Sequence, residues 1–167
     1  MTPPPFTVKP LEKEDRSSFA CGKGSLDHYF RTQISQDVRR QIATAFITIH
    51  TATETIAGFY TLSAAHVPFT DLNEDWRKKL PRYPTLPAVL VGRLAIDQHF
   101  QGHGLGSALL ADAAIRSIRS DIGAHFLIVD ALDEDAMLFY QHHGMRRIPG
   151  TDNRLFIPLS VLAKRSA

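Results

Sequence analysis

The chain has 167 residues, of which 44% are apolar, and its 19 lysines and arginines nearly balance 17 aspartates and glutamates. This length and composition are typical of one globular domain and exclude a largely disordered chain, and the single cysteine, Cys21, excludes an intramolecular disulfide. Because no apolar run approaches the roughly 18 residues of a membrane span and the first residues lack a secretion signal, we expect a cytoplasmic protein that does not enter a membrane.

The first part of the chain predicts a short strand, one helix and two further strands. The strand is expected over residues 6–8, and the helix from an N-cap at Ser25 to about Gln41. Strands rich in β-branched and aromatic residues are expected over 45–50 and 56–62, joined by a polar connection of hairpin length. The helix is predicted because apolar residues recur at three- and four-residue steps, at Leu26, Tyr29, Phe30, Ile34, Val38 and Ile42.

Residues 64–87 are the least regular stretch. Prolines at 68, 81, 84 and 87 disfavour regular structure except around 72–80. A long insertion in a compact domain is usually functional or mobile. We therefore expect an irregular, proline-rich insertion within a single domain over 1–167, carrying the basic residues Arg77, Lys78, Lys79 and Arg82.

The second part of the chain predicts alternating strands and helices. Residues 88–96 are typical of a strand buried on both faces, and a glycine-rich loop and a helix to about Ser120 follow. A strand is expected over 126–130, then a helix capped by Asp133 and stopped at Gly144, and a closing strand over 154–159. This order predicts a mixed α/β fold with helices flanking a sheet.

The glycine-rich loop predicts an anion site. A loop that joins a buried strand to a helix places backbone N–H groups at the helix N-terminus, which favours phosphate. The dinucleotide fingerprint fails because Ser107 or Leu109 stands where its last glycine is required, and no Lys-Ser/Thr pair of a P-loop follows. The alternative is a turn that only joins strand to helix, although three glycines at alternate positions exceed what one turn requires.

The remaining pattern, Gln101-x-x-Gly104-x-Gly106 directly after a strand, resembles the Q/R-x-x-G-x-G/A motif of the GNAT superfamily of acetyl-CoA-dependent N-acetyltransferases. Downstream, Phe139-Tyr140-Gln-His-His-Gly144 is similar to the F-Y-x-x-x-G-F element of that family, with Met145 in place of the final Phe. The resemblance covers the element order over most of the chain. It implies a GNAT-like, mostly antiparallel mixed sheet flanked by helices.

One branch of the superfamily is matched more closely. Segments at 19–21, 26–29, 36–37, 58–63 and 91–97 are similar to the GNAT toxins of type II toxin–antitoxin modules, and Asp133 fits this branch where many other members carry Asn. The resemblance implies acetylation of the amine of aminoacyl-tRNA, inhibition of translation, a ribbon-helix-helix antitoxin and a homodimer. The alternatives are a GNAT enzyme acting on a small-molecule or protein amine, and a non-catalytic acyl-CoA-binding regulatory module.

The resemblance also implies the roles of individual residues. The glycine loop would hold the CoA pyrophosphate, and the preceding strand would offer main-chain groups to the pantetheine arm. The implied acetyl-CoA residues are Leu94, Ala95, Ile96, Gln101, Gly102, His103, Gly104, Leu105, Gly106, Ser107 and Phe139.

Tyr140 is the candidate catalytic residue. A phenol with a pKa near 10 stays protonated at neutral pH and can donate a proton to the leaving thiolate. The alternative is a core tyrosine packed beside Phe139. An α-amine with a pKa of about 7.7–8 is partly neutral at physiological pH and could attack without a dedicated base. His66, His99 and Asp97 are conceivable bases, but no spacing singles one of them out.

The basic residues suggest where a polyanion would bind. Arg77, Lys78, Lys79, Arg82 and Arg93 are the candidate tRNA contacts, and the alternative for the clustered residues is a solvated face. Arg93 could instead pair with a carboxylate in the sheet. The eight histidines show no metal-binding spacing, so no metal site is expected.

Overall fold

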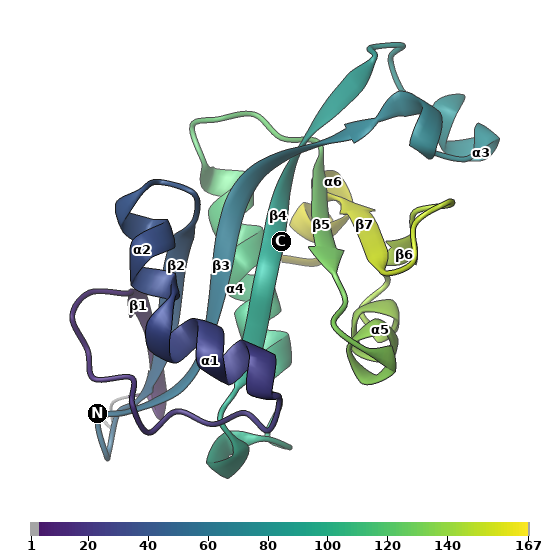
Figure 1. Cartoon of the computed structure of the whole chain (residues 1–167). Helices are drawn as coiled ribbons and strands as arrows, with labels where there is room; N and C mark the ends of the chain where they lie inside the picture. Colours follow the sequence, from purple (N-terminus) through teal and green to yellow (C-terminus); the bar gives the residue numbers. More distant parts are fainter. Residues whose placement is uncertain (1–3, 167) are drawn as a thin grey trace. The chain divides into compact units, whose positions relative to one another are not determined.

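The computed structural model describes residues 4–166 and has a mixed α/β fold (Figure 1). Seven strands form one sheet in the order β1-β2-β3-β4-β5-β7-β6. The elements are β1 (Phe6–Pro10), α1 (Gly24–Thr32), α2 (Ile34–Arg39), β2 (Thr44–His50), β3 (Thr55–Pro68), α3 (Glu74–Arg77), β4 (Thr85–Ile96), α4 (Leu105–Arg119), β5 (Phe126–Asp130), α5 (Glu134–His142), β6 (Arg146–Arg147), β7 (Arg154–Pro158) and α6 (Leu159–Ser166), with short 3₁₀ turns at Phe69–Asp71 and Gln98–Phe100.

The predicted mixed, mostly antiparallel sheet is confirmed. β1 and β2, β2 and β3, β5 and β7, and β6 and β7 pair antiparallel, whereas β4 and β5 pair parallel. The chain divides into two compact units. The first contains the residues up to Ser63 together with Gly92–Asp112, and the second contains Ala64–Val91 and the residues from Ala113 onward. No helix within residues 4–166 has the length and apolar character needed to cross a membrane.

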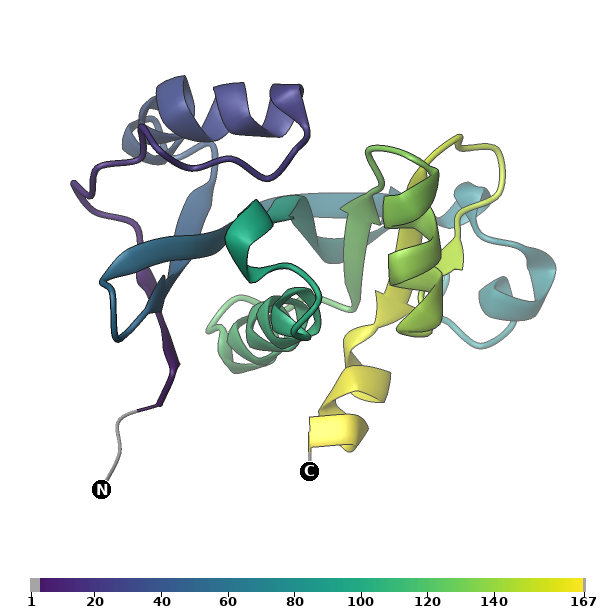
Figure 2. The ribbon, with the colours of Figure 1, turned by 90° about the horizontal axis from the view of Figure 1, so that it is seen from below.

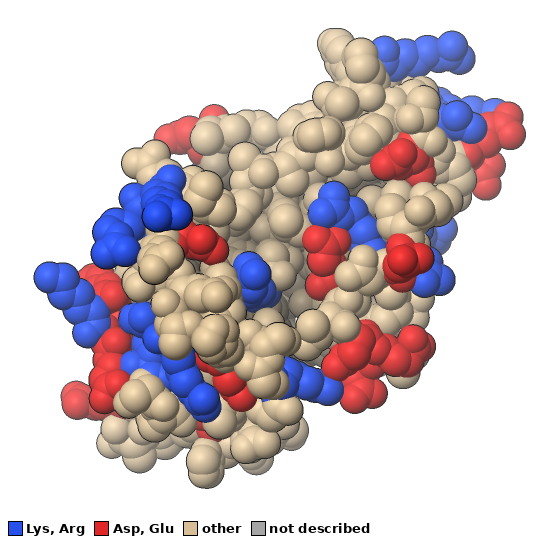
Figure 3. All heavy atoms as spheres, viewed as in Figure 1, with Lys and Arg blue, Asp and Glu red and all other residues tan. Residues whose placement is uncertain are grey.

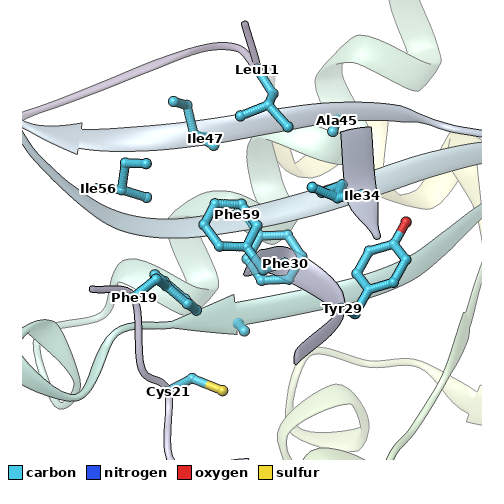
Figure 4. Close-up of a cluster of buried hydrophobic side chains, with 11 residues drawn as sticks. Leu11, Phe19, Cys21, Tyr29, Phe30, Ile34, Ala45, Ile47, Ile56 and Phe59 are labelled. Atoms are coloured by element: carbon cyan, nitrogen blue, oxygen red, sulfur yellow. The ribbon is translucent and has the colours of Figure 1, made fainter. Parts of the chain in front are cut away.

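The first unit has a core of aromatic and aliphatic side chains between its strands and the first two helices. Helices α1 and α2 lie over one face of β2 and β3, and the first half of α4 lies on the other face (Figures 1 and 2). Phe30 of α1 stacks on Phe59 of β3 with ring centroids 4.3 Å apart, and Phe19 packs against both (Figure 4). These contacts fix α1 on the sheet.

The helix predicted from Ser25 to Gln41 is divided in two. Gln33, at φ −117° and ψ −30°, is the C-cap of α1 and the N-cap of α2, so one helix ends and the next begins at this residue. The prediction of Ser25 as N-cap is wrong, because Lys23 occupies that position. Since α2 ends at Arg39, Ile42 lies outside the helix and is 61% exposed instead of joining the core.

The second unit is built around the parallel pair β4–β5 and the antiparallel neighbour β7. Ala88–Val91 pair with Phe126–Val129, and β7 pairs with β5 along its length. Phe126 and Trp76 both make edge-to-face contacts with Phe156. The core therefore anchors the segment that contains the tryptophan.

The irregular stretch is shorter than 64–87. β3 continues to Pro68 and β4 begins at Thr85, which leaves residues 69–84 with only a 3₁₀ turn and α3. Val67 and Leu86 are buried in the core beside Phe126, and this burial stabilises the added strand residues. Pro87 is compatible with the strand because its carbonyl, rather than the missing N–H, bonds to the N–H of His125.

The predicted elements of the second part are confirmed to within a few residues. Asp133 caps α5 by accepting the N–H of Ala136 at 2.9 Å, as expected, and Gly144 ends the helix region at φ +88°. The short strand β6 and the helix α6 were not predicted from the sequence.

Candidate active site

A buried aspartate fixes the turn between β4 and the glycine loop. Asp97 Oδ2 accepts the N–H of Ala20 at 3.0 Å, and Oδ1 accepts the N–H of His99 at 2.9 Å and lies 2.8 Å from Nδ1 of the same histidine. Burial opposes ionisation of this carboxyl, but the hydrogen bonds from His99 and Ala20 outweigh it and lower its pKa. Asp97 therefore holds the loop in place. Because both of its carboxylate oxygens already accept hydrogen bonds, it is poorly suited to act as a general base.

Gln101, the first residue of the motif, ties the loop to the rest of the first unit. Its Nε2 donates to the carbonyl of Cys21 and to the carbonyl of Ile96, both at 2.8 Å. Both amide protons are used within the protein, so the side chain has no N–H left for a cofactor. Its contribution to cofactor binding would be to hold the loop in place.

The loop itself presents backbone without side chains. Gly102 and Gly104 adopt φ values of +84° and +78°, and no atom lies within 4 Å of the position that a Cβ would occupy at either residue. The N–H of Ala108 donates to the carbonyl of Gly104 as α4 begins. The preceding N–H groups of Leu105 and Gly106 have no intrahelical acceptor, as at every helix start. This exposed cradle at a helix N-terminus fits a phosphate group.

The end of β4 is held close to β3 by a glycine. A Cβ at Gly58 would lie 2.9 Å from the carbonyl oxygen of Ala95 and 2.8 Å from Cδ1 of Ile96. The last paired residues of the two strands are Val91 of β4 and Val129 of β5. β5 ends one residue later, at Asp130, whereas β4 continues to Ile96. The last residues of β4 thus extend past β5, and their main-chain groups on that side have no strand partner in it. A ligand could pair with them as an added strand.

Tyr140 lies in the second unit, on α5. It is 6% exposed and its ring contacts that of Phe139, with centroids 5.2 Å apart. Its hydroxyl makes no hydrogen bond with any of residues 4–166, and burial raises its pKa above the usual value for tyrosine. The one enclosed side-chain polar atom without a partner among residues 4–166 is Oγ1 of Thr48, so the Tyr140 hydroxyl keeps access to solvent. The hydroxyl is therefore a protonated donor that is available to a ligand.

Arg93 does not pair with a carboxylate of residues 4–166, so that sequence-based alternative is wrong for the described chain. Its guanidinium lies over the ring of Tyr29, 3.6 Å from the centroid, and its backbone N–H donates to Oγ1 of Thr61 at 3.1 Å. The Tyr29 hydroxyl donates to Oδ2 of Asp37 at 2.7 Å. Arg93 is thus a half-buried cation held against an aromatic face.

The basic residues around α3 lie beside acidic ones. Lys78, the C-cap of α3, pairs with Glu74 of that helix at 3.6 Å, and Nζ of Lys79 lies 5.5 Å from the centroid of the Trp76 ring. Arg77 is half-buried and Arg82 is exposed. Basic and acidic side chains are neighbours in this part of the surface (Figure 3). A polyanion that binds here would meet a mixture of charges.

The remaining polar candidates contribute little to a site. His66 and His99 are exposed, and no three His, Cys, Asp or Glu side chains within residues 4–166 are arranged to hold a metal ion. Sequence reasoning missed two features. The first is the Tyr29–Asp37 pair, although both residues lie in the segments that resemble the toxin branch. The second is an open, polar cavity of about 430 Å³ in the second unit, lined in part by Asp133, Glu134, Met137, Gln141, Arg147 and Asp152.

Comparisons with known proteins show to which family the chain is similar. The profile of the acetyltransferase (GNAT) domain matches residues 48–146. The tRNA-acetylating toxin of Mycobacterium tuberculosis is 34% identical over 140 residues, which cover 83% of this chain and 82% of the toxin.

Solved structures of acetyltransferase toxins are similar to this chain over nearly its whole length. The structure of AtaT complexed with acetyl-methionyl-tRNAfMet is similar, with a TM-score of 0.85 and 31% identity over 97% of this chain and 99% of that one. A tyrosine-to-phenylalanine mutant of AtaT, bound to the C-terminus of the antitoxin AtaR and acetyl-CoA, has a TM-score of 0.82 and 27% identity over 98% and 99% of the two chains.

Proposed function

Because the chain belongs to the acetyltransferase (GNAT) family, we propose that it transfers the acetyl group of acetyl-CoA to the amine of an aminoacyl-tRNA and thereby inhibits translation. The acceptor is supported by the relatives, of which one is a tRNA-acetylating toxin and another was solved with acetyl-methionyl-tRNAfMet. The observation that carries the acetyl transfer is the hydroxyl of the buried residue Tyr140, which has no hydrogen-bond partner within residues 4–166.

The residues that would hold acetyl-CoA lie at the end of β4 and in the following loop. Backbone N–H groups of Gly102–Ser107, with the positive end of the α4 dipole, would bind the pyrophosphate. Main-chain groups of Leu94–Ile96 would hydrogen-bond the pantetheine arm, since β4 extends past β5 there. Bound acetyl-CoA supplies an acetyl thioester with a thiolate leaving group. A backbone N–H of this strand would stabilise negative charge on the acetyl oxygen.

As the amine nitrogen bonds to the acetyl carbon and the carbon–sulfur bond breaks, Tyr140 would donate a proton to the departing sulfur, and the proton that the nitrogen loses would return to the phenolate through solvent. Burial raises the pKa of its hydroxyl, so the donor form persists over the whole neutral range. The attacking amine requires no protein base, because an α-amine with a pKa of about 7.7–8 is partly neutral at physiological pH. Asp97, with its lowered pKa and three bonded donors, is not needed in the reaction.

We infer that the whole chain acts as one acetyltransferase domain, since the matched segment 48–146 includes parts of both compact units. An antitoxin partner is supported by the AtaT structure that contains the AtaR C-terminus. Its ribbon-helix-helix class and the homodimer stay predictions from the resemblance. A tRNA substrate would place the reaction in the cytoplasm.

The proposal is tested with radiolabelled acetyl-CoA and two matched acceptors, a charged tRNA and the same tRNA after deacylation. We expect label in the charged tRNA only. Label in neither tRNA, together with acetylation of a polyamine or a protein N-terminus, would replace the tRNA acceptor by a small-molecule or protein amine. Binding of acetyl-CoA without transfer to any amine would instead indicate a regulatory module.

A further inference from the structure

Arg93, Tyr29 and Asp37 of the first unit form a series of contacts that ends in a cation without a carboxylate partner among residues 4–166. We propose that the Arg93 guanidinium binds a phosphate group of the tRNA acceptor, and that Tyr29 and Asp37 are positioning residues that orient it. The identity of the acceptor rests on the proposed function. The inference extends the substrate site to α1 and α2, which carry neither of the two superfamily motifs.

The contacts fix the direction of the guanidinium. It lies 3.6 Å from the centroid of the Tyr29 ring, close enough for a cation–π contact. Tyr29 is buried in the core formed by α1, and its hydroxyl donates to Asp37 Oδ2 in α2 at 2.7 Å (Figure 4 shows Tyr29 within this core). Burial and the hydrogen bond to Asp37 raise the pKa of Tyr29 to about 12 against the opposing effect of Arg93, so the hydroxyl remains a donor to Asp37 at neutral pH. The ring is thus held from both helices.

The lack of a counter-ion points to a ligand. Arg93 is half-buried and forms no ion pair with any carboxylate of residues 4–166. Withdrawing a charge from water is costly, and the contact with the Tyr29 ring does not neutralise the charge of the guanidinium. The planar guanidinium has N–H groups spaced to bind two phosphate oxygens at once. An orientation fixed in advance lowers the entropic cost of that binding.

The phosphate can come from CoA or from the tRNA, and position favours the tRNA. Arg93 precedes Ile96, the last residue of β4, by three residues, or about 10 Å of extended chain. The cradle that fits a pyrophosphate comes later, at Gly102–Leu105. Because the glycine loop would take the CoA pyrophosphate, we assign Arg93 to a phosphodiester of the acceptor strand near the aminoacyl group.

The test measures KM for charged tRNA, KM for acetyl-CoA and the Kd for deacylated tRNA. Arg93→Gln is expected to raise the KM and the Kd for tRNA about tenfold. It should also make binding less dependent on salt. The slope of the logarithm of the binding constant against the logarithm of the salt concentration should change by about 0.7, the value for one phosphate contact on a single strand. The KM for acetyl-CoA should stay within about twofold.

The positioning role is tested by a double-mutant cycle. Tyr29→Phe keeps the ring but frees it from Asp37, and we expect a rise in tRNA KM and Kd of about threefold. The same change in the Arg93→Gln background should have no further effect, because Tyr29 acts only through Arg93. Tyr60→Phe is the matched control. It also removes a tyrosine hydroxyl that donates to an aspartate, Asp112, and it should leave the KM for tRNA unchanged.

Three results would overturn parts of the inference. An equal effect of Tyr29→Phe in both backgrounds would mean a purely structural role. A rise in the KM for acetyl-CoA alone would assign the phosphate to CoA. Unchanged Kd for deacylated tRNA in Arg93→Gln would remove the phosphate contact. If the wild-type chain does not acetylate charged tRNA, the proposed function fails, and the Kd measurements still decide whether Arg93 binds tRNA.

Discussion

The hydroxyl of Tyr140 is a polar atom on a buried side chain, and the phenylalanine ring would fill the same space. We predict that Tyr140→Phe lowers kcat by about 100-fold or more, the usual contribution of a positioned acid, because no other donor is assigned to the leaving thiolate. The Kd for acetyl-CoA, measured by calorimetry, should change less than twofold. Tyr83→Phe, which alters an exposed tyrosine, is the control and should keep full activity. Near-normal turnover in Tyr140→Phe would remove this residue from the mechanism.

The carboxyl of Asp97 links stability to pH. Its folded-state pKa is below the ordinary value of 3.8, so the folded protein gains stability from the ionised form above about pH 4 and loses it as the pH falls through the lower folded value. Asp97→Asn should therefore reduce the free energy of unfolding at pH 7, by about 1–3 kcal/mol, and make it less dependent on pH in the acid range. Urea unfolding between pH 2.5 and 7 measures both effects; parallel pH curves for the two proteins would contradict this role.

At the scale of elements, the distance between β3 and β4 depends on Gly58. A Cβ there would meet the Ala95 carbonyl at 2.9 Å, and backbone cannot move aside as a flexible side chain can. Gly58→Ala should lower the free energy of unfolding by about 1–3 kcal/mol and raise the KM for acetyl-CoA, because it displaces the end of β4.

A matched substitution separates this steric effect from the general effect of replacing glycine. Gly24 begins α1, and no atom lies within 4 Å of a Cβ placed there. Gly24→Ala should be neutral or slightly stabilising in the same urea titration, since alanine favours the helix. Equal destabilisation by both substitutions would show that contact with Ala95 is not the cause.

Local sequence patterns predicted most helices and strands. Contacts between distant segments determined features that those patterns do not show. The apolar spacing from Leu26 to Ile34 indicates a helix correctly, but no glycine or proline marks the break at Gln33. Likewise, Val67 and Leu86 extend β3 and β4 only because a core made by distant strands buries them. β6 has two residues, and a segment of that length has no periodicity to read.

Short motifs in the sequence point to the candidate site residues. The glycine loop and Tyr140 stand out in the sequence, and the loop has the open, left-handed backbone that the motif implies. Gln101 is expected at the cofactor, and the sequence does not show that its side chain donates to the carbonyl of Cys21, 80 positions away in the chain. The Tyr29–Arg93 contact joins a helix and a strand 64 positions apart, and periodicity indicates only that Tyr29 is buried.

At the scale of the whole molecule, binding to tRNA should depend on charges outside the two motifs. Replacing Arg77, Lys78 and Lys79 together by Gln should weaken tRNA binding and make it less dependent on salt. The slope of the logarithm of the binding constant against the logarithm of the salt concentration should become shallower by about 0.7–0.9 for each phosphate that the variant no longer neutralises. The variant should stay nearly as stable as the wild type, because the exposed pair of Lys78 with Glu74 contributes about 0.5 kcal/mol or less.

Glu74→Gln is a control that should change tRNA binding in the opposite direction. It removes an acidic group from the same helix and should strengthen tRNA binding. Filter binding at several salt concentrations measures both variants. An unchanged salt slope in the triple variant would remove the α3 segment from the tRNA site.

The central claim, acetylation of the amine of an aminoacyl-tRNA, is tested most directly by locating the acetyl group. Charged tRNA is incubated with the protein and acetyl-CoA and digested with nuclease, and the terminal aminoacyl-adenosine is analysed by mass spectrometry. We predict one added acetyl group on the α-amine of the amino acid with the wild-type chain and almost none with Tyr140→Phe. An unmodified aminoacyl-adenosine, in a reaction where the same protein acetylates another amine, would contradict the account.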